Sequence, residues 1–269
     1  MKKAVLSIWK PPCGRQVTAW TWEKSICFLF FISALSYASL SVGPSRLEIL
    51  IEKNQVFQST YTLVNAYDSD VDVTVDVSDW NTYKGNGELD ANSWIKITPS
   101  KVHLKKGEKK DITFEVKTTD SMQGSVSGMV SFSYRPPGNP GLLIKISCSV
   151  YLTIRGTQQI DFEIADVLIK KHENGFKTHV QINNNGNVHI RPSGEIVIYN
   201  KKNKPVYTAK ILEYHPVYAG SSSFSVSDNM ELKALKPGKY IAEILIKSLD
   251  RTVTKKVEFR LKKDGSVIQ

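Results

Sequence analysis

Hydrophobic and polar residues alternate along most of the chain after residue 40. The clearest case is the run VDVTVDVS at 71–78, in which the valines are separated by Asp72, Thr74 and Asp76. Because successive side chains of a strand point to opposite faces, this period of two predicts a strand with one buried and one solvent-exposed face. Almost no segment has the spacing of an amphipathic helix.

Turn-rich stretches separate these runs, for example KKGE at 105–108 and PPGNPG at 136–141. Short strands with a turn every ten residues or so predict antiparallel β-sandwiches. In the first half we expect strands at 47–51, 61–65, 71–78, 112–116, 128–134 and 142–155. In the second half we expect strands at 160–169, 176–182, 194–199, 206–211, 222–227, 239–248 and 252–261.

Each half has the size of one immunoglobulin-like sandwich, which takes about 100 residues. We therefore predict an all-β chain with two immunoglobulin-like antiparallel β-sandwich domains in tandem. The N-terminal domain is expected at 39–156 and the C-terminal domain at 157–263, followed by a tail at 264–269. The short polar step RGTQQ at 155–159 predicts a tight linker between them.

One motif occurs in both halves. VHLKKGEKKDITF at 102–114 and LKALKPGKYIAEI at 232–244 each have an apolar residue, a Gly turn and an alternating strand. In the second, Leu235 and Tyr240 fit a tyrosine corner, in which the Tyr hydroxyl bonds to nearby backbone. We interpret both motifs as structural corners and not as sites.

The first 38 residues have the pattern of a signal peptide. Five Lys or Arg residues accompany the apolar run ICFLFFISAL at 26–35, and SYA at 36–38 supplies the small residues that signal peptidases accept. We expect export with cleavage after Ala38. An uncleaved membrane anchor is the alternative, but about ten apolar residues fall short of the roughly 20 that span a bilayer.

Cleavage would leave Cys148 as the only cysteine, so no intrachain disulfide could form and a hydrophobic core must hold the mature chain. It would also remove five Lys/Arg and one Glu from the 36 basic and 26 acidic residues, which leaves 31 and 25, a net charge of +6. This surplus is spread along the chain, which favours a solvated surface over a nucleic-acid groove.

The motifs that would indicate catalysis, a cofactor or a metal are missing from the sequence. The five histidines lack zinc-ligand spacing, and only His179 and His189 are close enough along the chain to suggest a shared site. The densest acidic group, Asp68, Asp70, Asp72 and Asp76, lacks the Gly and Glu of an EF-hand calcium loop, so we interpret it as part of a solvated strand face. We predict that the protein is not an enzyme.

The stretch NNNGNVHIRPSGEIVIYN at 183–200 has the composition of a ligand loop. One alternating strand ends before it, and EIVIY within it begins another. The Asn and Gly residues supply the conformations that a connection needs. We therefore predict that His189 and Arg191 are only side chains on an inter-strand connection.

Two tryptophans, Trp80 and Trp94, flank a loop rich in Gly, Asn and Lys. Exposed aromatic rings there could hold a sugar, whereas buried rings would fill the sandwich core, and we favour the core.

The longest apolar alternation is LLIKISCSVYLTIR at 142–155, with seven apolar residues expected on one face of one strand. Strands usually have five or six residues, so one end of this strand could offer an open edge to a partner, as in β-strand addition. A long core strand that runs into the linker explains the same pattern equally well.

Several segments of the first half occur in a characteristic order: SVGPSRLEI at 41–49, YTLVN at 61–65, DW at 79–80, WIKITP at 94–99, GMVSF at 128–132 and the long last strand. In this order they resemble the N-terminal domain of bacterial periplasmic pilus-assembly chaperones. The second half, with NGNVHIRPSG at 185–194, is similar to the second sandwich of chaperone-like and cell-wall-associated bacterial proteins of the same superfamily.

The resemblance implies that the chain binds an incomplete pilus subunit. In that family, alternating apolar residues of the last strand of the first domain fill the subunit's open groove, and a mobile loop precedes that strand. Leu142, Ile144 and Ile146 match these donor residues, and residues 136–141 match the loop.

The resemblance also implies an anchor for the subunit's C-terminal carboxylate, which the family builds from an Arg of the first strand and a Lys late in the last strand. Arg46 matches the Arg, but Tyr151 stands at the Lys position. Loss of that Lys removes a charge-assisted hydrogen bond of about 1.5–3 kcal/mol, unless the Tyr hydroxyl donates a neutral one.

We therefore predict an exported, periplasmic, chaperone-like protein that binds pilus or fibre subunits by donor-strand contacts, with an outer-membrane usher as a further candidate partner. No cofactor, small-molecule substrate or nucleic acid is expected. The first alternative is a structural immunoglobulin-like protein at the cell surface or in the periplasm that serves adhesion or the cell wall. The second is a carbohydrate-binding module that uses Trp80 or Trp94.

Overall fold

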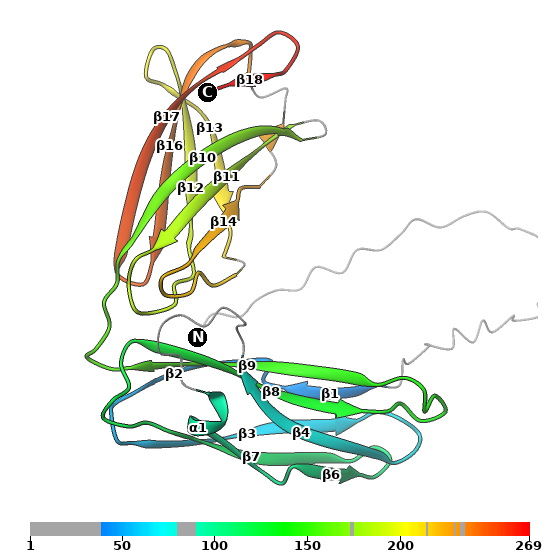
Figure 1. The fold of residues 1–269 in the computed structure, drawn as a ribbon. Coiled ribbons are helices and arrows are strands. Elements are labelled where there is room, and N and C mark those ends of the chain that lie inside the picture. Colours follow the sequence, from blue (N-terminus) through cyan, green and yellow to red (C-terminus); the bar gives the residue numbers. More distant parts are fainter. Residues whose placement is uncertain (1–38, 80–89, 173–174, 214, 229, 232–234) are drawn as a thin grey trace, which may run out of the picture. The chain divides into compact units, whose positions relative to one another are not determined.

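Strands form nearly all of the regular structure (Figure 1). The computed structural model describes residues 39–79, 90–172, 175–213, 215–228, 230–231 and 235–269. These residues belong to one unit, Ala38–Gln269. The predicted signal peptide and Trp80 lie outside the described residues.

The first sandwich consists of two sheets with the strand orders β1-β3-β7-β5 and β2-β9-β8-β4-β6. Neighbouring strands are antiparallel except for β2 and β9, which are parallel. The strands are β1 (Leu40–Gly43), β2 (Arg46–Ile51), β3 (Val56–Asn65), β4 (Val71–Asp79), β5 (Ile95–Thr98), β6 (Lys101–Leu104), β7 (Lys109–Lys117), β8 (Ser125–Tyr134) and β9 (Ile144–Ile154).

Aromatic rings from both sheets meet in the core of the first sandwich. The ring centroid of Tyr61 in β3 lies 4.9 Å from that of Phe114 in β7 and 5.3 Å from that of Phe132 in β8. Burial raises the pKa of the Tyr61 hydroxyl far above its ordinary value. The valines at 71, 73 and 75 also point into this core, while Asp72 is exposed, so the predicted alternation of β4 is confirmed.

One helical turn, α1 (Ala91–Trp94), precedes β5 and is absent from the sequence prediction. The Asp90 carboxylate caps it by accepting a hydrogen bond from the Asn92 N–H at 2.9 Å. The turn buries Trp94, which is 2% exposed, in the core. The core interpretation of Trp94 is therefore confirmed, and its use as an exposed sugar platform is excluded.

The second sandwich has one sheet with the order β10-β11-β14, in which β15 also pairs with β11, and one with the order β13-β12-β16-β17-β18. Its buried residues form a separate hydrophobic core, so the predicted tandem of two sandwiches is confirmed. The strands are β10 (Phe162–His172), β11 (Gly175–Asn184), β12 (Ser193–Asn200), β13 (Pro205–Ile211), β14 (Ser222–Val226), β15 (Met230–Glu231), β16 (Gly238–Ser248), β17 (Arg251–Leu261) and β18 (Val267–Ile268).

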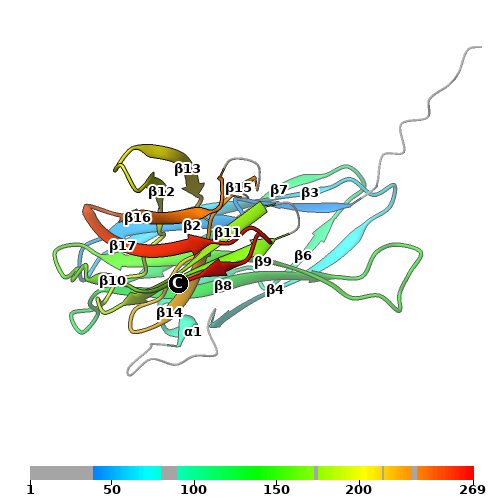
Figure 2. The same cartoon turned by 90° about the horizontal axis from the view of Figure 1, so that it is seen from above.

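Two local features complete the second sandwich. The Tyr240 hydroxyl donates a hydrogen bond to the Lys236 carbonyl at 2.5 Å, which confirms the tyrosine corner. Strand β18, which Figure 1 labels, lies within the predicted tail and pairs Ile268 with Arg260 of β17. Figure 2 marks the C-terminus, which lies beside β10 and β17. The domain boundaries themselves stay a prediction.

Candidate partner-binding site

Strand β9 has a neighbour on both sides over only part of its length. From Ser149 to Thr153 it pairs with β2 on one side and β8 on the other, whereas β8 is its only partner at residues 144–148 within the described part of the chain. The Ser149 N–H donates to the Ser45 carbonyl at 3.1 Å, toward β2. Because alternate residues direct their backbone groups the same way, Lys145 and Ser147 point theirs toward the side without a strand. Residues 144–148 are therefore an open edge.

The apolar side chains of this region change in exposure along the strand. Cys148, Val150, Leu152 and Ile154 are buried in the core. Ile144 and Ile146 are half-buried and pack against the rim of that core. The second half of β9 is thus a core strand, and its first half combines an edge with accessible apolar surface.

The predicted start of this strand at Leu142 is wrong, because β9 begins at Ile144. The Leu142 N–H donates to the Asn139 carbonyl at 3.1 Å and so closes a turn instead of extending the sheet. Leu142 is 46% exposed and Leu143 58% exposed. Two accessible leucines therefore precede the open edge.

Arg46 lies where the open edge ends, since it is the residue of β2 that pairs with Ser149. Its Nε is 3.7 Å from Glu48 Oε1 and its Nη1 is 3.7 Å from Glu213 Oε1, and its side chain is 48% exposed. Ion pairs of this length and exposure contribute little free energy. The guanidinium group is therefore accessible to another carboxylate.

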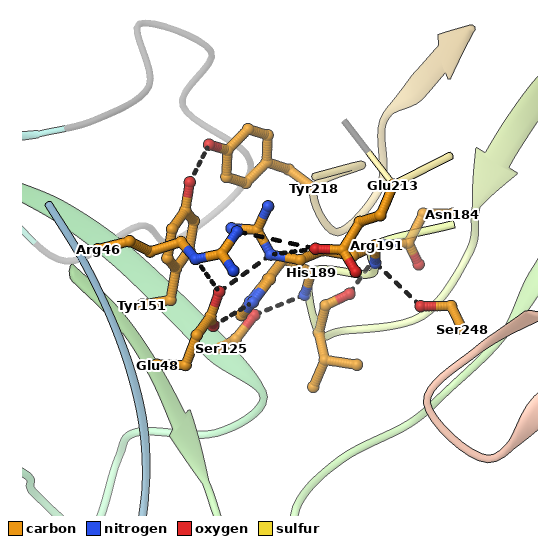
Figure 3. A network of polar contacts seen from close by, with 11 residues as sticks. Arg46, Glu48, Ser125, Tyr151, Asn184, His189, Arg191, Glu213, Tyr218 and Ser248 are labelled. Atoms are coloured by element: carbon orange, nitrogen blue, oxygen red, sulfur yellow. Dashed lines mark hydrogen bonds and ion pairs between the residues drawn. The ribbon is translucent and has the colours of Figure 1, made fainter. Parts of the chain in front are cut away.

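Glu48 is the centre of a polar network that Figure 3 shows in detail. It accepts hydrogen bonds from Arg191 Nε and from His189 Nε2, both at 3.0 Å. Burial raises the pKa of the Glu48 carboxyl, but the hydrogen bonds and charges of His189 and Arg191 outweigh this effect, so the pKa lies below its ordinary value. Glu48 of the first sandwich is thus held as a carboxylate by two residues of the second sandwich.

Tyr151 lies beneath this network and is 2% exposed. Its ring centroid is 4.7 Å from that of His189, and the Arg191 guanidinium carbon lies 4.8 Å from the Tyr151 centroid, a cation–π arrangement. Its hydroxyl lies 3.4 Å from the Tyr218 hydroxyl (Figure 3). Tyr151 is therefore covered by a cation from the second sandwich.

The prediction that His189 and Arg191 are only side chains on a connection is wrong. Their side chains are 10% and 14% exposed, and their backbone N–H groups donate to Ser125 Oγ at 2.7 Å and Ser248 Oγ at 2.9 Å. Arg191 Nη2 and His189 Nδ1 are buried without a hydrogen bond to any described residue. Arg191 Nη2 is therefore a buried donor that the described residues leave unused.

Sequence reasoning also missed the two carboxylates of the network, Glu48 and Glu213. The one signal in the sequence was the density of Asn, Gly, His and Arg at 183–200. His179, the suggested partner of His189, does not belong to the network and lies on another face of the second sandwich.

A close backbone approach fixes the turn that carries His189. The Asn187 carbonyl accepts a hydrogen bond from the Ser125 N–H at 2.9 Å. Gly124 has a φ of +64°, and a Cβ atom there would lie 2.2 Å from the Asn187 carbonyl oxygen. Only glycine permits this contact.

The other candidate sites of the sequence have structural explanations. His103 lies 2.8 Å from an Asp72 oxygen and 3.3 Å from an Asp70 oxygen on an exposed strand face, as expected for a solvated surface. Within the described ranges, His, Cys, Asp and Glu form no group of three that could hold a metal ion. No helix among these residues is long and apolar enough to cross a membrane.

Comparisons with known proteins find similarity only among solved structures, since no family model and no curated protein matches the chain. The Salmonella enterica SafA pilin–SafB chaperone complex matches with 12% identity and a TM-score of 0.45, over 83% of this chain and 99% of the matched chain. The E. coli chaperone DraB matches with 15% identity and a TM-score of 0.42, over 82% and 97%. The Acinetobacter baumannii CsuC–CsuE chaperone–tip subunit complex matches with 12% identity and a TM-score of 0.43, over 81% and 98%.

These structures are pilus chaperones and their complexes with subunits. Identities of this size are no evidence of what the present chain binds.

Proposed function

We propose that this protein is an exported, non-enzymatic, chaperone-like protein that binds a partner protein by strand addition along residues 144–148. The observation that carries the proposal is the open edge of β9, which ends at the half-exposed Arg46. The partner class, a pilus or fibre subunit that lacks a strand, and the periplasmic location are those that the sequence resemblance implies. An usher at the outer membrane is a further candidate partner.

The backbone of the edge supplies the binding groups. The N–H and C=O groups of Lys145 and Ser147 point away from β8, and an extended segment can pair with them as a new strand of the sheet. Ile144 and Ile146 are only half-buried and Leu142 is exposed, so they offer apolar contacts to the partner's side chains. The hydrogen bonds favour any extended chain, and the apolar contacts favour a partner with its own exposed hydrophobic groove.

The direction of the added strand follows from the charge at the end of the edge. A segment that runs parallel to β9, as β2 does, brings its C-terminus to Arg46, whereas an antiparallel segment brings its N-terminus there. A guanidinium group binds a carboxylate and repels an α-ammonium group. The added strand is therefore parallel and ends at Arg46.

Arg191 supplies the second positive charge for the carboxylate, because Tyr151 carries none. Arg46 and Arg191 both approach Glu48 Oε1, at 3.7 and 3.0 Å, and both approach Glu213 Oε1, at 3.7 and 3.9 Å. Two guanidinium groups that reach the same oxygens can also share an incoming carboxylate. Glu213 has the longer contacts, so it is the carboxylate that a partner's C-terminus displaces.

Replacement of Lys145 tests the strand-addition proposal. Lys145→Pro removes one N–H from the open edge and leaves the bonds to β8, while Lys145→Ala removes the same side chain and its ion pair with Asp76 but keeps the N–H. Tagged protein isolated from its native cell envelope should co-purify with a subunit in the wild type and in Lys145→Ala, but not in Lys145→Pro. Equal capture by both variants, or no captured subunit at all, would show that residues 144–148 do not bind by strand addition.

A further inference from the structure

A basic cavity lies in the second sandwich, on the sheet formed by β10, β11 and β14. Its volume is about 620 Å³, and it is lined by lysines and histidines together with Phe224 and the residues that follow it in β14. None of these residues belongs to the Glu48 network or to the open edge of β9. The basic residues that line it are Lys170, Lys171, His172, Lys177, His179 and His215.

Two of its lysines face each other across neighbouring strands. Lys170 of β10 is the direct partner of Lys177 of β11 in the sheet register. Like charges directly opposite one another destabilise a sheet. An anion between the two ammonium groups would remove this repulsion.

The cavity has no compensating acidic side chain in the described structure. Its lysines and histidines form no ion pair with any described carboxylate. The segment from Phe224 to Ser227, which also lines the cavity, does not titrate near neutral pH. Burial, with the charges of Lys170, Lys177 and His172, lowers the pKa of His179. The positive charges thus act on one another and not on an acid.

One wall of the cavity is apolar. Phe224 is 56% exposed and lies opposite Gln181 of β11, while Val226 lies opposite His179. An exposed aromatic ring beside a group of cations suits a ligand that carries a charged group on an apolar or ring-shaped body.

We propose that this cavity binds a phosphate group, and that Phe224 contacts the apolar part of the molecule that carries it. Several convergent cations match the double charge of a phosphate monoester better than the single charge of a carboxylate. The phosphate can belong to a small molecule in solution or to the headgroup of an anionic lipid, since both present the same chemistry to Lys170 and Lys177.

Isothermal titration with phenyl phosphate, inorganic phosphate and acetate tests the site in the full mature chain. Phenyl phosphate should bind most tightly and acetate least. Lys170→Gln/Lys177→Gln should weaken phenyl phosphate binding by at least roughly tenfold, because two charge-assisted contacts are lost. Phe224→Ala should weaken the binding of phenyl phosphate but not that of inorganic phosphate.

The matched control is Lys204→Gln/Lys247→Gln, which removes two exposed lysines outside the cavity and gives the same net charge. It should leave binding unchanged. Sedimentation with vesicles that contain phosphatidic acid, whose headgroup is a phosphate monoester, distinguishes the two sources: vesicle binding that is lost only in Lys170→Gln/Lys177→Gln assigns the phosphate to a lipid headgroup. Equal losses in the two double variants, or no binding of any phosphate probe, would overturn the proposal.

Discussion

Arg46 and Ser149 lie directly opposite each other at the point where β2 begins to pair with β9. On the far side of this pair, β9 continues for five residues, 144–148, with only β8 beside it in the described structure. The half-exposed guanidinium group of Arg46 therefore lies at the end of the unpaired edge.

Replacement of Arg46 should weaken partner binding without unfolding the protein. Its ion pairs are long and solvent-exposed, so Arg46→Ala should change the free energy of unfolding by less than about 1 kcal/mol. Binding of a captured subunit should weaken by roughly tenfold or more, because a charge-assisted bond to its carboxylate is lost. Titration of the isolated subunit measures this, with exposed Arg260→Ala as control; equal affinities of both variants would remove Arg46 from the site.

The pKa of Glu48 predicts how its contribution to stability depends on pH. A carboxyl group whose pKa is lowered in the folded protein stabilises it above the ordinary pKa of 4.5, and this contribution is lost as the pH falls through the folded value. Glu48→Gln should therefore lower the free energy of unfolding at pH 7, by about 1 kcal/mol after allowance for solvent screening. Urea unfolding should show a larger difference from the wild type at pH 7 than at pH 3.

The control for this measurement is Glu258→Gln, which changes an exposed carboxylate on β17. It should have little effect at either pH. A Glu48→Gln variant as stable as the wild type at pH 7 would show that the network adds nothing to stability.

Burial makes the thiol of Cys148 unreactive. It is 1% exposed, and burial raises its pKa to about 11. Because the thiolate is the reactive form, the native protein at pH 8 should react with iodoacetamide far more slowly than a free cysteine, and the urea-unfolded protein should react at the ordinary rate. Mass spectrometry of samples taken over time measures both rates; rapid native labelling would contradict the burial of this strand.

The opposed lysines of the second sandwich should destabilise the protein when no anion is bound. Lys177→Gln should raise the free energy of unfolding by roughly 0.2–1 kcal/mol in a buffer without multivalent anions, because it removes a like-charge pair across two strands. Thermal unfolding with and without phosphate measures this, with Lys204→Gln as control. If the unfolding midpoint of Lys177→Gln in the phosphate-free buffer were unchanged or lower than that of the wild type, repulsion between the two lysines would not destabilise the sheet.

The fold follows from short-range patterns in the sequence, which explains why most of it is predictable. A strand such as β4 needs only a period of two, and the corner at Tyr240 needs only a local motif. The single turn of α1 escapes prediction because four residues are too few to show a helical period.

The candidate site depends on contacts between distant segments. Arg46, Leu142, Ile144, Ile146 and Tyr151 follow from the resemblance to pilus chaperones, and their roles stay a prediction. No pattern in the neighbourhood of Glu48 indicates that it will meet His189 and Arg191, since these residues lie 141 and 143 positions away along the chain. Nor does the sequence of β9 indicate where β2 stops pairing with it.

The parallel pairing of β2 with β9 also sets how much chain the edge can hold. Five residues of extended strand measure about 17 Å, and past Ser149 the position of a new strand is already occupied by β2. A segment from the middle of another protein would have to leave the sheet at this point, while a chain that terminates there would not. Under the proposed strand addition, the edge therefore limits the length of the added segment and favours a chain terminus over a segment from the middle of a chain.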